Sequence, residues 1–275
     1  MNEYYFLLPP FAMCILLVGI HCYLGLHVLA RGVIFVDLSL AQVATFGTAL
    51  ALWIGLEHTS TQAYLISLSS TLIAAVFFAW GRRFEQIFSQ EAVIGIVFAM
   101  ASAAVILVVD NVAHGAEHVK ESMIGHILWV SWNDVYRTAI IYALIGVIHY
   151  IFRKQILNVS FTHSTGHHDL WWDFLFYALF GFTITSSVSV AGVLLVFSFL
   201  IVPAIVGTVF FTTIRARLIF GWIFGTVLSC IGLLLSLKWD VPAGALLVTM
   251  FGLVPIVMVV LYPVIKRIRP VHRPS

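Results

Sequence analysis

Hydrophobic residues fill the chain in long runs that no charged residue interrupts. These runs lie at 4–30, 38–56, 58–81, 92–109, 138–152, 174–214, 218–237 and 241–265. Most of them reach the roughly 20 residues that an α-helix needs to cross the hydrocarbon core of a bilayer. The run at 174–214 is long enough for two passes, and SSVSVAG at 186–192 is the expected turn between them. The pattern predicts an all-α, polytopic transmembrane helical bundle with eight to nine spanning helices.

Composition supports the same class. Of 275 residues, 61% are hydrophobic and 9% are charged, whereas a soluble domain carries about a quarter charged residues. No linker, low-complexity tract or internal repeat divides the chain, so we expect one transmembrane domain over 1–275. The N-terminal stretch holds Glu3 and no basic residue, unlike a cleaved signal peptide, so the first helix is expected to be retained. Three cysteines lie in apolar runs without a C-x-x-C pair and are interpreted as core residues: Cys14, Cys22 and Cys230.

The basic residues are distributed unevenly between the two ends of the predicted spans. With nine spans and an outer N-terminus, 11 of the 14 Lys and Arg residues fall on one side. The positive-inside rule makes that side cytoplasmic. The outer side keeps only Lys120, Arg137 and Lys238. We therefore expect a multi-pass protein of the inner (plasma) membrane with a cytoplasmic C-terminus. The segment 110–133 is expected on the outer side and is called the outer segment.

The run at 31–55 contains polar residues inside an apolar span. Asp37 lies six residues after Arg31, near the predicted membrane boundary. It is either an interfacial carboxylate, which pairs with a cation or caps the helix, or a group on a polar pathway. Ser39, Gln42, Thr45 and Thr48 follow at intervals of three. Such a stripe is typical of a helix that lines a translocation path, and equally of interhelical hydrogen bonding. The candidate path residues are Asp37, Ser39, Gln42 and Thr45.

The outer segment contains HGAEH at 114–118. His114, Glu117 and His118 match the H-x-x-E-H order of one metalloprotease class. Such an enzyme needs a third zinc ligand, and no glutamate follows Glu121. We interpret His114, Glu117 and His118 as candidate metal ligands that attract a divalent cation from outside; an intramembrane protease and a solvated loop with incidental histidines are the alternatives.

A second imidazole cluster and a missing motif complete the candidate chemistry. His163, His167, His168 and Asp169 lie on the predicted inner side, as an exit patch or as an ordinary loop. The chain contains no Gly-Lys dipeptide and hence no P-loop, so it cannot hydrolyse ATP by that route. Any ATP-driven motor must be another polypeptide, and no catalytic residue is proposed.

Four stretches resemble, in order and spacing, the membrane permeases of the zinc/manganese/iron family of bacterial ABC importers. They are RGVIFVDLSLAQVATFGTALAL (31–52), EAVIGIVFAMASAAVIL (91–107), VAGVLLVFSFLIVPAIVGTVFF (190–211) and WDVPAGALLVTMFGLV (239–254). The most specific parts are the block from Ala191 to Ala204 and the Asp-x-Pro-x-Gly turn at Asp240, Pro242 and Gly244.

The resemblance implies a permease that carries a divalent metal ion, with zinc as the default and manganese or iron as alternatives, and no permanently bound cofactor. It implies a homodimer, two cytoplasmic ABC ATPase subunits and an extracytoplasmic metal-binding protein. It also implies that about 205–217 contacts the ATPase. The residues expected to couple the two subunits are Thr212, Thr213, Arg215 and Arg217.

One departure concerns the second span. Many members of that family carry a histidine there, in a stretch like GDALSHAVLPG, and alignment on Gly47 places Gln42 at the histidine and Leu38 at the aspartate. An amide is a poorer zinc ligand than imidazole, whereas hard ions accept oxygen. An ion-coupled secondary metal transporter with Asp37 as the titrating group is the alternative function, although no inverted repeat supports it.

Overall fold

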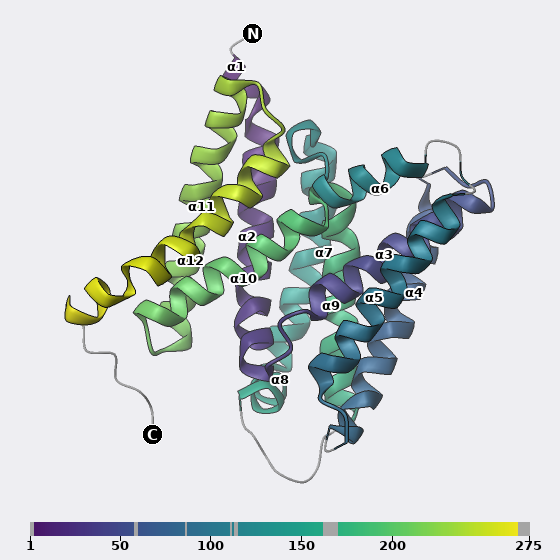
Figure 1. The fold of residues 1–275 in the computed structure, drawn as a ribbon, viewed down its shortest axis with the longest axis horizontal. Helices are drawn as coiled ribbons and strands as arrows, with labels where there is room; N and C mark the ends of the chain where they lie inside the picture. The colour runs from purple at the N-terminus through teal and green to yellow at the C-terminus, as the bar shows by residue number, and fades with distance from the viewer. Residues whose placement is uncertain are drawn as a thin grey trace.

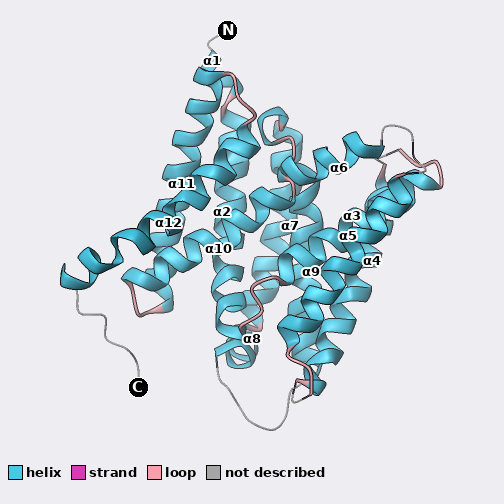
Figure 2. Ribbon diagram, in the orientation of Figure 1, coloured by secondary structure: helices cyan, strands magenta, loops and turns pink. Residues whose placement is uncertain are grey.

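The computed structural model of the chain describes residues 3–57, 60–85, 87–110, 112, 115–161 and 170–268. These residues form helices joined by short loops, and no strand occurs among them (Figure 2). The α-helices are α1 (Glu3–Phe6), α2 (Leu8–Arg31), α3 (Val36–Trp53), α4 (Thr61–Gly81), α5 (Gln90–Val109), α6 (Gly115–Ile124), α7 (Trp132–Ile151), α8 (Arg153–Phe161), α9 (Leu170–Ala191), α10 (Val193–Phe210), α11 (Ile214–Trp239) and α12 (Ala243–Ile268). Two short 3₁₀ turns are η1 (Arg82–Phe84) and η2 (Ile127–Trp129).

Nine helices of the described residues are long and apolar enough to span a membrane, namely α2 to α5, α7 and α9 to α12. This confirms the upper limit of the predicted count. The outer segment adds no span because α6 has only 10 residues, about 15 Å of helix. In Figure 1, α1 and α6 lie toward the upper end of the bundle and α8 lies at the lower end.

The long run at 174–214 forms two helices, as predicted, but its turn is shorter than expected. Helix α9 continues to Ala191, and α10 starts at Val193. Only Gly192, the last residue of the expected turn, leaves the helical conformation, with φ +75°. A left-handed φ costs glycine little, so one residue redirects the chain, and α10 crosses the bundle obliquely (Figure 1).

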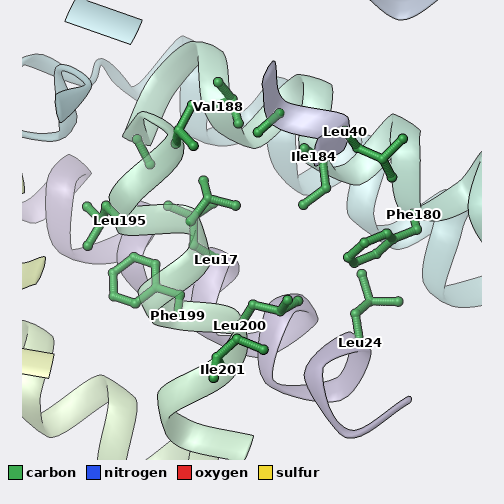
Figure 3. Close-up of a cluster of buried hydrophobic side chains, with 14 of the residues drawn as sticks. Leu17, Leu24, Leu40, Phe180, Ile184, Val188, Leu195, Phe199, Leu200 and Ile201 are labelled. Carbon is green, nitrogen blue, oxygen red and sulfur yellow. The ribbon is translucent and has the colours of Figure 1, made fainter. Parts of the chain in front are cut away.

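Helices α2, α3, α9 and α10 form the centre of the bundle, and each buries most of its spanning window. Their apolar side chains interdigitate in one core, with Leu17 and Leu24 of α2, Leu40 of α3, Phe180 of α9 and Phe199 of α10 among the buried members (Figure 3). Helices α5, α7, α11 and α12 lie at the periphery and leave large apolar side chains exposed. A helix that is apolar all round suits contact with lipid.

An ion cluster joins four segments at the lower end of the bundle. Arg31, at the end of α2, donates through Nη1 to Oδ1 of Asp173 in α9 at 2.9 Å and through Nε to Oγ of Ser160 in α8 at 2.9 Å. Arg82 of η1 forms a second ion pair with the same Asp173 oxygen. The Arg31 guanidinium also lies 3.8 Å from the ring centroid of Phe176. Buried charges are tolerated when paired in this way.

At the opposite end, three glycines allow the segment after α6 to pack directly on the backbone of other helices. Gly125 has φ +70°, and a Cβ there would overlap the backbone of Ala191. A Cβ on Gly192 would overlap Gly125, and one on Gly244 would overlap the carbonyl of Ile124. The segment 123–126 is therefore held against the α9–α10 junction and the start of α12.

Candidate functional site: a polar face on α3 and an outer cavity

The four candidate path residues on α3 are all buried inside a single chain. The exposed fractions are 1% for Asp37, 0% for Ser39, 2% for Gln42 and 6% for Thr45. Helix α3 packs mainly against α4, α5 and α9. Burial within one chain favours an interior route or interhelical hydrogen bonding over a contact with a second copy.

The polar groups of α3 differ in how their hydrogen bonds are satisfied. Thr45 and Thr48 donate to the carbonyls of Ala41 and Ala44 on their own helix, at 3.0 and 3.2 Å. In contrast, Oδ1 of Asp37 and Oγ of Ser39 have no hydrogen-bond partner among the described residues. Buried oxygens without a partner are rare and call for an explanation.

Asp37 lies at the start of α3, as expected, but it does not pair with the cation nearest to it along the sequence. It lies in the first turn of α3, which begins at Val36 after Phe35 as N-cap. Its neighbour along the sequence, Arg31, pairs with Asp173 instead, and among the described residues no ion pair of Asp37 occurs. The adjacent carboxylate of Glu91, at the start of α5, accepts a hydrogen bond from the backbone N–H of Phe35 at 3.2 Å.

A polar cavity of about 70 Å³ lies beside the other half of α3. Its walls come from helices α3, α4 and α9 and from the outer segment. The outer segment contributes Glu121 and Ser122 of α6, and His126 after the end of α6. The hydroxyl-bearing residues of the lining are Thr45, Thr48, Tyr64, Ser67, Ser122, Thr185 and Ser189. This volume holds several water molecules. Thr45 is the candidate path residue that lines it.

Met123 of the outer segment contacts the polar face of α3. Its sulfur lies 3.9 Å from Nε2 of Gln42. Thioether sulfur is a weak acceptor, so the contact separates easily.

The candidate metal residues of the outer segment are only partly brought together. His114 lies outside the described residues. Glu117 is exposed on α6, and His118 lies one residue further along the same helix. The closest approach is to a different carboxylate: Nδ1 of His118 lies 3.7 Å and Nε2 of His126 lies 3.8 Å from Oε2 of Glu121. Sequence reasoning did not select Glu121 and His126 as ligands, although the three-residue spacing of His118 and Glu121 was a usable signal.

The predicted coupling residues lie at the turn between α10 and α11. Thr212, Thr213 and Arg215 are exposed. Oγ1 of Thr213 accepts from the backbone N–H of Ala216 at 3.3 Å and so caps α11. Nε of Arg217 donates to the carbonyl of Phe211 at 2.9 Å, which fixes the turn. The inner cluster of His163, His167, His168 and Asp169 lies outside the described residues.

Comparison with known proteins places this architecture in a family. The model of the ABC 3 transport family matches residues 3–262, nearly the whole chain. This chain belongs to the ABC 3 transport family. The family match confirms the resemblance found in the sequence, and it makes the chain a membrane permease subunit of an ABC transporter. ATP hydrolysis belongs to a separate subunit, as the missing P-loop requires.

Individual relatives agree with this family. The chain is 24% identical over 236 residues to a "Probable iron transport system membrane protein" of Haemophilus influenzae, with 84% of this chain and 81% of the relative covered. It is 22% identical over 247 residues to the "Manganese transport system membrane protein MntC" of Halalkalibacterium halodurans, with 86% and 82% covered.

The fold is also similar to a solved structure, "PsaBC from Streptococcus pneumoniae in complex with Fab", with a TM-score of 0.73 and 21% identity. The alignment covers 91% of this chain and 90% of that chain. This similarity therefore covers most of the fold of both chains.

Proposed function

We propose that this ABC 3 family permease imports a divalent metal ion and that its α3 face and outer cavity form the passage. Two findings support the proposal: the family match, and the relatives whose names give iron and manganese as the transported metals. The observation that carries it is the pair of buried α3 oxygens, Asp37 Oδ1 and Ser39 Oγ, which lack partners among the described residues. An ion in transit supplies the missing partner.

The donor chemistry favours manganese or iron over the zinc default. The candidate path offers a carboxylate, an amide and hydroxyls on Asp37, Gln42, Ser39 and Thr45. Oxygen donors suit Mn²⁺ and related harder ions, whereas zinc prefers imidazole and thiolate. Gln42, at the place where related permeases carry histidine, offers only its carbonyl oxygen to a cation.

The charge asymmetry supports the proposed orientation. The cytoplasmic side of the bundle then holds the helix ends with Arg31, Arg82 and Arg153. The turn with Arg215 and Arg217 and the C-terminus lie on the same side. The cavity between α3 and the outer segment then opens toward the outside, where a metal-binding protein delivers the ion. Two permeases and two ATPase subunits complete the transporter.

Alternating access follows from the positions of the cavity and the coupling turn. Met123 contacts Gln42, which lies between Thr45 and Asp37 along α3, and in the proposed mechanism this contact closes the passage between the cavity and Asp37. Movement of the ATPase subunits pushes the turn around Thr213, shifts α10 and α11, and moves α10 relative to α3 and α6, which it contacts. The contact between Met123 and Gln42 opens, and the ion passes along α3 toward the inner side.

The test uses the permease purified with its ATPase in lipid nanodiscs, and vesicles for uptake. Mn²⁺ should stimulate ATP turnover by the wild-type complex, and Asp37→Asn or Gln42→Ala should reduce Mn²⁺ uptake while assembly with the ATPase persists. Leu38→Ala, on the same turn of α3, is the matched control. An absence of metal-stimulated turnover would contradict the importer function, and normal uptake by both path variants would remove them from the passage.

A further inference from the structure

Glu121 lies between two imidazoles at the mouth of the cavity. His118 is three residues before it on α6, so the two side chains share one face of that helix. His126 follows the end of α6, and its Nε2 lies 3.8 Å from the same carboxylate oxygen. Two features fix His126: the left-handed φ of Gly125 and a hydrogen bond from the His126 backbone N–H to the carbonyl of Val190 at 3.0 Å.

The spacing of these donors is close to that of ligands on one metal ion. Neighbouring ligands at about 2.1 Å from an octahedral ion lie about 3 Å apart, and those of tetrahedral zinc lie about 3.4 Å apart. The nitrogen-to-oxygen distances here are 3.7 and 3.8 Å. Among the described residues no three His, Cys, Asp or Glu side chains are placed to hold an ion as they stand, so binding requires both imidazoles to move toward the Glu121 carboxylate and toward each other.

The three side chains have room for that movement. Their exposed fractions are 30% for His118, 41% for Glu121 and 52% for His126. Water therefore reaches the group from outside. A site that closes on the ion, instead of being formed in advance, binds it weakly enough to release it, which permeation requires.

The group also leads directly into the protein. Glu121 and His126 line the cavity, and hydroxyls of Thr45 and Thr48 on α3 face them across it. An ion held at Glu121 exchanges water molecules for these oxygens as it enters. Met123, two residues after Glu121, contacts Gln42.

We propose that His118, Glu121 and His126 form the entry site that takes up a divalent transition-metal ion at the outer mouth of the cavity. This inference rests on the proposed function and adds a defined receiving site to it. One carboxylate with two imidazoles suits Mn²⁺, Fe²⁺ or Zn²⁺ better than Ca²⁺ or Mg²⁺, which prefer oxygen ligands alone. The site supplies the imidazole that α3 lacks at Gln42.

Binding of Mn²⁺ to the permease–ATPase complex in nanodiscs tests the proposal, measured by the loss of the free Mn²⁺ signal in electron paramagnetic resonance. Glu121→Gln and His126→Asn should each weaken binding by at least about tenfold. Pulsed resonance should show imidazole nitrogen coupled to bound Mn²⁺ in the wild type and a reduced coupling in His126→Asn. Glu57→Gln, which neutralises another exposed acid at the outer end, should bind within about twofold of the wild type.

Two measurements separate failure of the entry site from failure of the importer function. The Mn²⁺ concentration that half-saturates ATP turnover should rise by a similar factor in both variants, with the maximal turnover retained. A wild-type complex that binds no Mn²⁺ and shows no stimulated turnover contradicts the function. If Mn²⁺ stimulates the wild-type complex but the half-saturating Mn²⁺ concentration is unchanged in both variants, the entry site is contradicted and the importer function is not. If Glu121→Gln fails to assemble, His126→Asn decides, because asparagine keeps the backbone bond to Val190.

Discussion

The ion cluster around Asp173, at the lower end of the bundle in Figure 1, allows a quantitative stability prediction for Asp173→Asn. Neutralising this carboxylate leaves two guanidiniums close together, with the Arg31 side chain 0% exposed and the Arg82 side chain 11% exposed. Removing one partner of a buried ion pair costs about 3 to 5 kcal/mol. Arg31 keeps its bond to Ser160 and its contact with Phe176, so the lower part of that range is expected.

The assay is thermal unfolding of the detergent-purified permease, followed by tryptophan fluorescence. A loss of about 3 kcal/mol corresponds to a decrease of roughly 10 °C in the apparent midpoint. Glu85→Gln, which neutralises an exposed acid at the same end of the bundle, should melt within about 2 °C of the wild type.

A double variant tests the cause of the loss. Replacing Arg31 by Met and Asp173 by Leu together removes the buried charges as a pair, and such replacements are often neutral. Arg82, which is partly exposed, can then turn to water. The double variant should melt above Asp173→Asn. The reasoning is wrong if Asp173→Asn melts with the wild type, or if the double variant is the less stable of the two.

Two further predictions concern the ends of the passage. Gly125→Ala should abolish Mn²⁺ uptake, because its methyl group overlaps the backbone at the end of α9. Gly19→Ala, where the space is open, is the control. Equal uptake by the two variants would contradict the close packing at Gly125. Arg217→Ala loses its bond to the Phe211 carbonyl and should lower metal-stimulated ATP turnover several-fold with Mn²⁺ binding unchanged, whereas wild-type turnover would exclude Arg217 from coupling.

The spans could be predicted from the sequence because membrane insertion depends on run length and charge, both local properties. The nine spanning helices of the described residues overlap the uncharged runs, and even the division of 174–214 falls at a residue of the expected turn. Glycine at 192 is recognisable as a chain-reversing residue. What the sequence could not show is that this glycine also makes room for Gly125, because that contact joins segments that are remote along the chain.

The pairing of charges was not predictable for the same reason. Arg31 and Asp37 are six residues apart, and proximity along the chain suggested a pair. The observed partner, Asp173, is 142 positions away and reaches Arg31 only when α9 packs beside α2 and α4. The outer histidines are similar: His126 approaches Glu121 because the backbone turns at Gly125, and neither helical spacing nor a known motif contains that turn.

The hydrogen bonds of α3 distinguish two roles for polar residues inside one span. Thr45 and Thr48 bond to their own helix, so they add little cost to a buried position and expose their remaining lone pairs to the cavity. Asp37 and Ser39 keep oxygens that no described group satisfies. A helix that used its polar residues only to associate with α4, α5 or α9 would satisfy those oxygens from its neighbours, because each unpaired buried group costs about 1 to 3 kcal/mol. Under the proposed function, a cation that occupies this position for part of each transport cycle offsets that cost.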